Sequence, residues 1–287
     1  MTVRYIDTHC HLQFKQYEQD REEIIERMKE EGVAAIVVGT DLETSKEAVV
    51  LAEKYEHLYA AVGIHPTHVR DIVSPSSDDG LTMSKLREFA KHPKVVAIGE
   101  CGLDYFRPEE VNDEVKNKQK ELLQKHITLA TELDKPLVIH VRPSKGTTDA
   151  YADLIEILKE AKKEYPKLRG DIHFFAGGLA EAEAFFILDF TISFTAVITF
   201  SRDYDELIRA VPLANILSET DAPYVAPLER RGERNDSFAV KSVVAKIAEI
   251  KGEDVEVVRT TLLDNAKRLF APVGDSTESL AGVLIPC

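Results

Sequence analysis

Near its start the chain reads VRYIDTHCH over residues 3–11. The apolar beginning of this stretch indicates a β-strand, and two histidines follow directly after it. Because side chains alternate between the two faces of an extended chain, His9 and His11 point the same way. Two imidazoles on one face can bind a single metal ion, although the same spacing also occurs in pairs of solvated or core histidines. The meaning of the pair therefore depends on what the later strands supply.

Short apolar runs and amphipathic stretches alternate along the rest of the chain, which is the pattern of βα units around a parallel sheet. Strands are predicted at residues 3–7, 33–38, 58–64, 95–99, 137–139, 170–174, 191–194 and 216–218. Helices are predicted at residues 18–31, 42–55, 83–91, 113–133, 148–164, 180–188, 203–210, 237–251 and 255–270. A Pro/Ser/Asp-rich loop is predicted at residues 67–80. Eight such units predict an α/β protein with the (β/α)8 TIM barrel fold.

The barrel is expected to form a single domain at residues 1–271, followed by a C-terminal tail at residues 272–287. A doubly wound open sheet is the alternative, but the chain lacks the Gly-rich phosphate loop that usually follows the first strand of such a sheet. We recognise no signal peptide and no membrane-spanning run, and the three cysteines have neither disulfide nor zinc-finger spacing. A cytoplasmic setting is therefore expected. The net charge of −14 argues against a surface that coats polyanions in general, but it is compatible with a small basic mouth.

Histidines and carboxylates collect at the predicted strand ends. The members of this set are His9, His11, His65, Glu100, His140, His173 and Asp221. Each has an ordinary explanation when taken alone, such as a hydrogen-bonded core histidine or a carboxylate that caps a turn. Five of the nine histidines belong to the set, however, and a buried carboxylate directly after the apolar run at residues 95–99 would be costly without a cation. Because the strand ends of a TIM barrel meet at one face, the set predicts a metal centre there.

Imidazole and carboxylate ligands together suit a divalent ion such as Zn, Mn, Ni or Mg. Leaving His65 aside, six candidate ligands are too many for one tetrahedral site with an open position. A two-metal site with a bridging carboxylate accommodates that number better.

Five short motifs carry a resemblance to a known family. They read IDTHCH at residues 6–11, GIHP at 63–66, GECGLDY at 99–105, PLVIH at 136–140 and ETDAPY at 219–224. Between residue 4 and about residue 270 the chain resembles the TatD family, metal-dependent deoxyribonucleases of the amidohydrolase superfamily. The resemblance implies a TIM barrel that hydrolyses phosphodiester bonds of DNA, with 3′-to-5′ exonuclease activity.

The resemblance also implies roles for individual residues around two divalent ions, which would be Mg, Mn or Zn. The ligands of the first ion would be His9, His11, Glu100 and Asp221, and those of the second would be Glu100, His140 and His173. Glu100 would bridge the ions, and Asp221 would orient the metal-activated water or take its proton, which makes Glu100 and Asp221 the catalytic candidates. Two segments depart from the family pattern. They read HFFAG at residues 173–177, where HCFSG is common, and RNDS at residues 234–237, where RNEP is usual.

Basic and aromatic residues near the strand ends are candidates for binding a nucleic acid. The basic ones are Arg107, Arg142, Lys145, Arg202, Arg230, Arg231 and Arg234. The aromatic ones are Tyr105, Phe106, Phe200 and Tyr224, which could stack on the bases of a single strand. Solvation explains any one of the charges at least as well, and core packing is the commoner fate of such aromatic residues. We expect DNA as the partner, as a single strand or a free end, with no nucleotide cofactor, and we expect substrate contacts from His65, Tyr105, Arg142, Arg202 and Arg234.

Three residues near the motifs have open or secondary roles. Asp7 precedes the histidine pair on the same face, where it could orient an imidazole or make a strand-end hydrogen bond. Cys10 and Cys101 are expected to pack between the barrel and its helices.

The main functional interpretation is a metal-dependent deoxyribonuclease. The nearest alternative is a barrel amidohydrolase that acts on a small lactone, amide or phosphoester. Relatives of that kind often bridge their metals with a carboxylated lysine on the fourth strand, where this chain has Glu100. A metal-binding scaffold without catalysis is the non-enzymatic alternative.

Overall fold

Eight parallel strands form one sheet in which each strand pairs with the next strand along the chain. The computed structural model describes residues 2–69, 79–106 and 111–270. The strands are β1 (Tyr5–Cys10), β2 (Val33–Val38), β3 (Leu58–Val62), β4 (Val95–Asp104), β5 (Leu137–Arg142), β6 (Gly170–Ile172), β7 (Phe190–Phe194) and β8 (Ile216–Ser218). Beyond the end of β8, a parallel bridge joins Cys10 to Ala222 and brings the last strand back to the first. The predicted TIM barrel is therefore confirmed.

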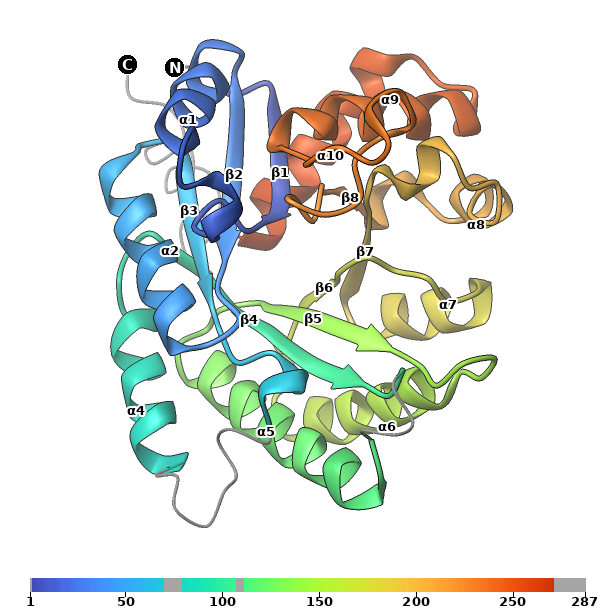
Figure 1. The fold of residues 1–287 in the computed structure, drawn as a ribbon. Coiled ribbons are helices and arrows are strands. Elements are labelled where there is room, and N and C mark those ends of the chain that lie inside the picture. The colour runs from blue at the N-terminus through green and yellow to red at the C-terminus, as the bar shows by residue number, and fades with distance from the viewer. Residues whose placement is uncertain (1, 70–78, 107–110, 271–287) are drawn as a thin grey trace.

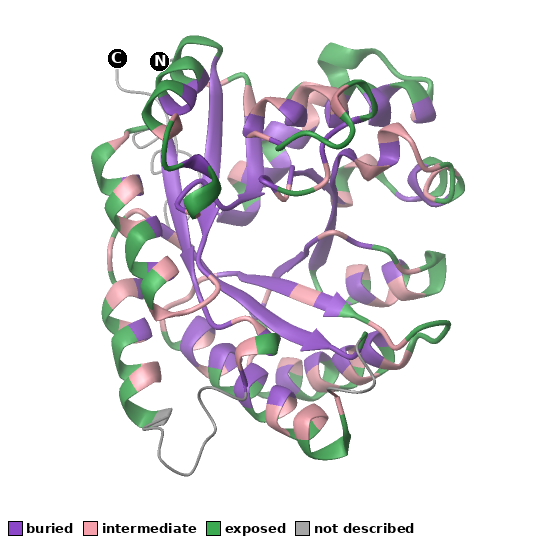
Figure 2. Cartoon of the chain, in the orientation of Figure 1, coloured by how far each residue is buried: buried purple, intermediate pink, exposed green. Residues whose placement is uncertain are grey.

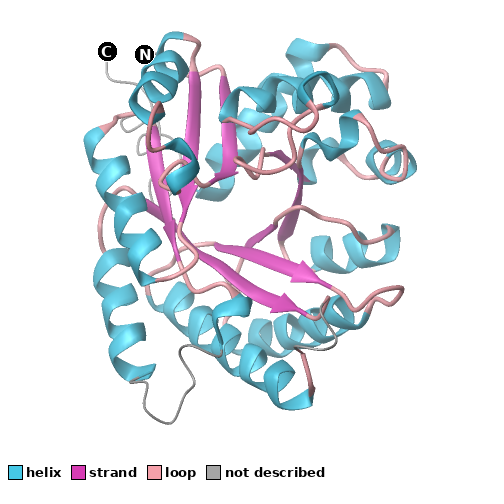
Figure 3. Ribbon diagram, viewed as in Figure 1, coloured by secondary structure: helices cyan, strands magenta, loops and turns pink. Residues whose placement is uncertain are grey.

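Helices surround the ring of strands, as Figures 1 and 3 show. They are α1 (Arg21–Glu30), α2 (Leu42–Lys54), α4 (Asp79–Ala90), α5 (Asp113–Glu132), α6 (Asp149–Glu164), α7 (Leu179–Ile187), α8 (Asp205–Ala210), α9 (Val240–Lys251) and α10 (Val255–Phe270). Within the described ranges, none of these helices is long and apolar enough to cross a membrane. Part of the loop predicted at 67–80, and the predicted tail at 272–287, lie outside the described residues.

Burial follows the sequence pattern from which the elements were predicted. Every residue of β2 is buried, because parallel strands are covered on both faces. In α6 the buried residues recur every three or four positions, which places one apolar stripe against the barrel. Figure 2 shows the same division, with buried strands inside and exposed faces on the outer side of the helices. Cys10 and Cys101 are fully buried, and their thiols face the carbonyl oxygens of Ile36 and Val138, so their predicted packing role is confirmed.

Strand β4 continues to Asp104, five residues beyond the predicted end at residue 99. Two glycines permit this extension. Gly99 and Gly102 have φ angles of 153° and 142°, and a Cβ atom on Gly102 would lie 1.9 Å from the carbonyl oxygen of His140. The absence of side chains thus lets β4 run close beside β5 through a register shift. As a result β4 presents two carboxylates, Glu100 and Asp104, at the same end of the barrel.

The start of α9 shows how this chain begins the helix without the proline that the family pattern has in the segment at residues 234–237. A short 3-10 turn at Ser237–Ala239 precedes the helix, and the Asp236 carboxylate accepts a hydrogen bond from the amide of Phe238 at 3.0 Å. This cap satisfies a backbone donor at the start of the turn, so the helix begins at Val240 without proline.

Candidate metal centre

A cavity of about 690 Å³ opens where the strands end. Its wall carries histidines and carboxylates that come from β4, β5 and the segments after β1, β3, β6 and β8. The residues that line it are His11, Phe14, Thr40, His65, Thr67, His68, Glu100, Asp104, His140, Val141, Arg142, Pro143, His173, Phe174, Ala176, Asp221 and Tyr224. The strand-end face of the barrel is therefore also where its ionisable side chains converge.

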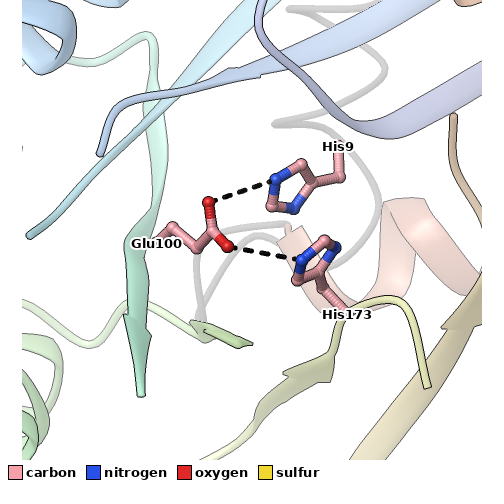
Figure 4. Close-up of side chains that lie close together, drawn as sticks. All are labelled: His9, Glu100 and His173. Carbon is pink, nitrogen blue, oxygen red and sulfur yellow. Dashed lines mark ion pairs between the residues drawn. The ribbon is translucent and has the colours of Figure 1, made fainter. Parts of the chain in front are cut away.

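Glu100 lies between two groups of histidines. Its Oε2 is 3.5 Å from Nε2 of His9 and 3.9 Å from Nε2 of His11. Its Oε1 is 3.2 Å from Nδ1 of His140 and 3.3 Å from Nε2 of His173. Figure 4 shows the carboxylate with one oxygen directed at His9 and the other at His173. The side chain is 5% exposed, so each oxygen of this buried carboxylate faces its own pair of imidazoles.

Asp221 completes the group around His9 and His11. Its Oδ1 is 3.5 Å from Nε2 of His11 and 3.9 Å from Nε2 of His9. Candidate ligand atoms of His9, His11 and Asp221 lie within 4.8 Å of one another, and so do those of His9, Glu100 and His173. Donor atoms this close can bind a common ion at ordinary ligand distances of about 2.0–2.2 Å. The structure thus brings together all six residues predicted as ligands.

The carboxylates of the centre are held in the form that binds cations. Burial alone would raise the pKa of Glu100, but the neighbouring imidazoles lower that pKa well below its ordinary value. The pKa of Asp221 is likewise lowered, because hydrogen bonding to His11 and the charges of nearby imidazoles outweigh its burial. Burial lowers the pKa of His9, which favours the neutral imidazole that a metal ion requires.

Partners outside the donor groups fix the orientation of the imidazoles. The Nδ1 atom of His11 donates to the carbonyl oxygen of Val38 at 2.7 Å. On the other side of the centre, Nδ1 of His173 is 3.3 Å from Oε2 of Glu219, whose second oxygen accepts from the Phe174 amide at 2.6 Å. Such partners set which ring nitrogen remains available for a metal.

Two carboxylates that contact the candidate ligands, Glu219 and Asp104, were not identified from the sequence. Oδ2 of Asp104 lies 3.1 Å from Nε2 of His140, and Glu219 is fully buried beside His173. Both residues stand inside the quoted motifs. Asp104 follows Glu100 by four positions on the same strand, so strand alternation offered a signal for it, whereas Glu219 lies beyond the end of β8. Asp7, which had two open roles, makes the strand-end hydrogen bonds, because its carboxylate accepts from the amide and the hydroxyl of Thr220 at 2.9 and 2.7 Å.

Two of the predicted substrate-binding residues line the cavity. Nε2 of His65 is 3.4 Å from Oε1 of Glu100, and its Nδ1 is 2.7 Å from the Thr67 hydroxyl. Burial lowers the pKa of His65 to about 3, so this ring is neutral at pH 7. The Arg142 guanidinium lies 3.7 Å above the ring of Phe106. Among the residues that the structure describes, Arg142 is the only arginine or lysine that lines the cavity.

The remaining three predicted substrate-binding residues do not reach the cavity. Tyr105 is fully buried and its hydroxyl donates to Oδ2 of Asp153 at 2.9 Å, so the prediction that its ring stacks on a base is wrong. It follows Asp104 directly, and the strand alternation that turns Asp104 inward turns Tyr105 towards the helices. Arg202 pairs with Asp205 at 3.4 Å and Arg234 with Asp20 at 2.5 Å.

The other candidates for nucleic-acid contacts have varied positions. Tyr224 lines the cavity with 49% of its surface exposed. Arg230 pairs with Asp236, and the Arg231 guanidinium lies 4.0 Å from the ring of Phe200. Lys145 is exposed and does not line the cavity, and Arg107 lies outside the described residues.

Comparison with known proteins places the chain in a family. The family described as TatD related DNase matches residues 6–271. The chain is 38% identical over 267 residues to the uncharacterized metal-dependent hydrolase YabD of Bacillus subtilis, covering 92% of this chain and 98% of that protein. It is 30% identical over 273 residues to a 3′-5′ ssDNA/RNA exonuclease TatD of Pectobacterium parmentieri, covering 92% and 98%.

A solved structure supports the same relationship. The crystal structure of YjjV, a TatD homologue from Escherichia coli, superposes with a TM-score of 0.80 at 32% sequence identity and covers 94% of this chain and 99% of that one. The matched segment contains the whole donor set described above. The chain therefore belongs to the TatD family of metal-dependent hydrolases.

Proposed function

We propose that this hydrolase is a nuclease that removes nucleotides from the 3′ end of single-stranded DNA with the help of two divalent ions. The observation that carries the proposal is the position of Glu100, whose two oxygens face two different histidine groups. A carboxylate placed in this way suits a two-metal centre, which is a common solution for phosphodiester hydrolysis. The related TatD exonuclease of Pectobacterium parmentieri supports nucleic acid as the substrate class.

The donor set is compatible with more than one metal. Four imidazoles and two carboxylates form a mixed nitrogen and oxygen set, which suits Zn or Mn. Mg prefers oxygen ligands and retains waters, so it would rely more heavily on Glu100 and Asp221. We therefore propose Mg, Mn or Zn as the ion, with His9, His11, Glu100 and Asp221 at the first position and Glu100, His140 and His173 at the second.

The residues of the centre have distinct tasks in the proposed reaction. Bound divalent ions would supply a Lewis acid that polarises a phosphate oxygen and lowers the pKa of a water molecule. Asp221 is ionised and its side chain is 14% exposed, so it can orient the attacking water and accept its proton. Glu100 holds the two donor groups at a fixed separation. His65 and Arg142 offer hydrogen-bond donors to the phosphate groups from the cavity wall.

The cavity favours a short stretch of nucleic acid over a long one. Of the arginines and lysines that the structure describes, Arg142 alone lines the cavity. One cation neutralises few phosphates, which fits a chain whose net charge is −14 and which acts at a strand end. Tyr224 offers an exposed ring at the same wall for one base. We also retain the single barrel domain at residues 1–271 and the cytoplasmic setting as proposals.

A nuclease assay with purified protein tests this function. A single-stranded DNA labelled at its 5′ end is incubated with Mg, Mn or Zn, or with a chelator, and the products are resolved by length. We expect a ladder that shortens from the 3′ end, that needs metal, and that falls roughly 100- to 10,000-fold in rate in Asp221→Asn. The matched control is Asp189→Asn, which changes a surface carboxylate that pairs with Lys162.

Two outcomes would overturn the proposal. Near wild-type hydrolysis in Asp221→Asn would show that Asp221 is not the proton acceptor. An absence of metal-dependent DNA products, together with turnover of a small lactone or phosphoester, would favour the alternative barrel amidohydrolase.

A further inference from the structure

His140 differs from the other candidate metal ligands in the nitrogen that it turns towards the centre. His9, His11 and His173 face Glu100 with Nε2, whereas His140 faces it with Nδ1 at 3.2 Å. Its other nitrogen, Nε2, points to Oδ2 of Asp104 at 3.1 Å. His140 therefore lies between two carboxylates, with one ring nitrogen directed at each.

The chemistry of a neutral imidazole assigns the two nitrogens different tasks. A neutral ring carries one N–H donor and one lone pair, and the location of the proton is inferred from the partners of the ring. A metal ion at the centre needs the lone pair on Nδ1 of His140, so the proton must be on Nε2. Asp104 accepts that proton's hydrogen bond, because an ionised carboxylate has lone pairs and no donor.

Asp104 is itself held in place from several directions. The Gln119 side chain on α5 accepts from the Asp104 amide at 2.9 Å and donates to its carbonyl oxygen at 3.0 Å. The second carboxylate oxygen, Oδ1, accepts from the amide of Phe106 at 3.0 Å. With Oδ1 occupied by a backbone donor, Oδ2 is directed at His140. The carboxylate therefore cannot turn away without losing the hydrogen bond from Phe106.

We propose that Asp104 is a positioning residue that holds His140 as the Nε2–H tautomer, leaving Nδ1 free to bind the second divalent ion. The inference rests on the proposed function only in taking His140 as a metal ligand. It assigns a task to a buried carboxylate that the mechanism above does not use. It also gives a role to the extension of β4 five residues past its predicted end, since the extension carries Asp104 to a position opposite Arg142, two residues beyond His140 on β5.

The substitution Asp104→Asn tests this assignment with little change in shape. The amide oxygen should take the place of Oδ1, because the Phe106 amide requires an acceptor there. The NH2 group then takes the place of Oδ2 and presents a donor to Nε2 of His140. Because a donor now faces Nε2, the ring should change to the Nδ1–H tautomer, which turns an N–H towards the metal position.

Two measurements report on this change without any nucleic acid. Protein labelled with 15N-histidine and loaded with two equivalents of Zn is examined by two-bond proton–nitrogen correlation, with His140 assigned through His140→Gln. The ion is needed because, despite burial, hydrogen bonding to Asp104 and Glu100 raises the pKa of His140, which favours a ring protonated on both nitrogens in the metal-free protein. We expect the Nε2–H pattern in the wild type and the Nδ1–H pattern in Asp104→Asn. In a Mn titration we expect the affinity for one of two ions to fall roughly 10- to 100-fold, which is the usual effect of removing the partner of a metal-binding histidine.

The matched control is Asp153→Asn, which changes the carboxylate that accepts from the hydroxyl of Tyr105, the residue next to Asp104. It touches none of the candidate ligands, so the tautomer of His140 and both affinities should stay as in the wild type. An unchanged Nε2–H pattern in Asp104→Asn would overturn the proposal.

The opposite result in the metal titration would also overturn it. His65, Asp104 and His140 offer ligand atoms within 4.8 Å of one another. If the wild type binds three ions and Asp104→Asn loses one while the other two keep their affinities, Asp104 is a ligand and not a positioning residue. Failure of the nuclease assay alone would leave these readouts unaffected, so the two proposals fail separately.

Discussion

Replacing Glu100 with glutamine tests the central feature of the metal centre. The substitution keeps the shape of the side chain. In the wild type each of the two oxygens faces a different histidine group, whereas glutamine has one oxygen and one NH2 group in these places. Whichever group the NH2 faces loses an anionic ligand and meets an N–H donor instead. Glu100 has close contacts on both sides, at 3.2 Å to Nδ1 of His140 and 3.5 Å to Nε2 of His9. Both ions should therefore bind more weakly, and one of them much more weakly.

The size of the effect follows from the number of charged contacts. An interaction with a charged group contributes about 1.5–3 kcal/mol, so losing one on each side of the centre costs about 3–6 kcal/mol. At about 1.4 kcal/mol for each factor of ten, this corresponds to a loss of roughly 100- to 20,000-fold in the combined affinity for two ions. We expect Glu100→Gln to retain at most one ion per chain, with a circular dichroism spectrum like that of the wild type.

Calorimetric titration with Mn, together with metal analysis of the dialysed protein, measures this loss. The matched control is Asp171→Asn, which changes a buried carboxylate on β6 whose two oxygens accept from the hydroxyls of Thr191 and Ser193, each at 2.6 Å. The control should still bind two ions. If Glu100→Gln also binds two ions with affinities within threefold of the wild type, Glu100 does not bridge the centre and the two-metal reasoning fails.

Two further predictions concern binding and stability. Arg142→Ala should weaken binding of single-stranded DNA roughly 10- to 150-fold, because one charged contact is lost. For the wild type, a plot of log affinity against log salt concentration should have a shallow slope of about −0.7 per phosphate contact. The control Arg202→Ala should change neither the affinity nor this slope. His126 accepts a hydrogen bond from the Ile64 amide through Nε2, and burial lowers its pKa to about 4. Because this pKa is below that of histidine in the unfolded chain, the neutral His126 ring stabilises the folded protein fully above about pH 6.5. This stabilisation is lost as the pH falls towards 4, which lowers the free energy of unfolding by on the order of 3 kcal/mol. Urea denaturation at several pH values should show this slope in the wild type and a smaller one in His126→Gln; equal slopes would contradict the assignment.

Much of the barrel could be predicted because its periodic patterns are local. The uninterrupted apolar run of β2 and the three-to-four-residue repeat in α6 follow directly from what each element must bury. The six candidate ligands were also accessible, because a TIM barrel brings its strand ends together whatever the loops contain. Topology alone thus placed His9 beside Glu100, although 91 positions separate them in the chain.

The partners of the ligands were harder to predict because they depend on distances between strands. Glu219 reaches His173 only because β8 and β6 hold them at a common level, 46 positions apart in the chain. Asp104 reaches His140 only because Gly99 and Gly102 let β4 continue beside β5, and a glycine in a strand does not by itself announce that outcome. Tyr105 was misplaced for the same reason, since the side on which a residue points depends on where the strand really ends.

The acidity of the chain can be reconciled with a nucleic-acid substrate by considering where the negative charge lies. Glu100, Glu219 and Asp221 surround the candidate metal positions. These groups would make a metal-free cavity repel phosphate. Divalent ions held by Glu100 and Asp221 would carry more positive charge than those two carboxylates carry negative charge, so the sign of the local field would reverse where the phosphate binds. Metal binding and substrate binding should therefore be coupled: single-stranded DNA should bind weakly to the metal-free protein at any salt concentration, and much more tightly once the ions are present.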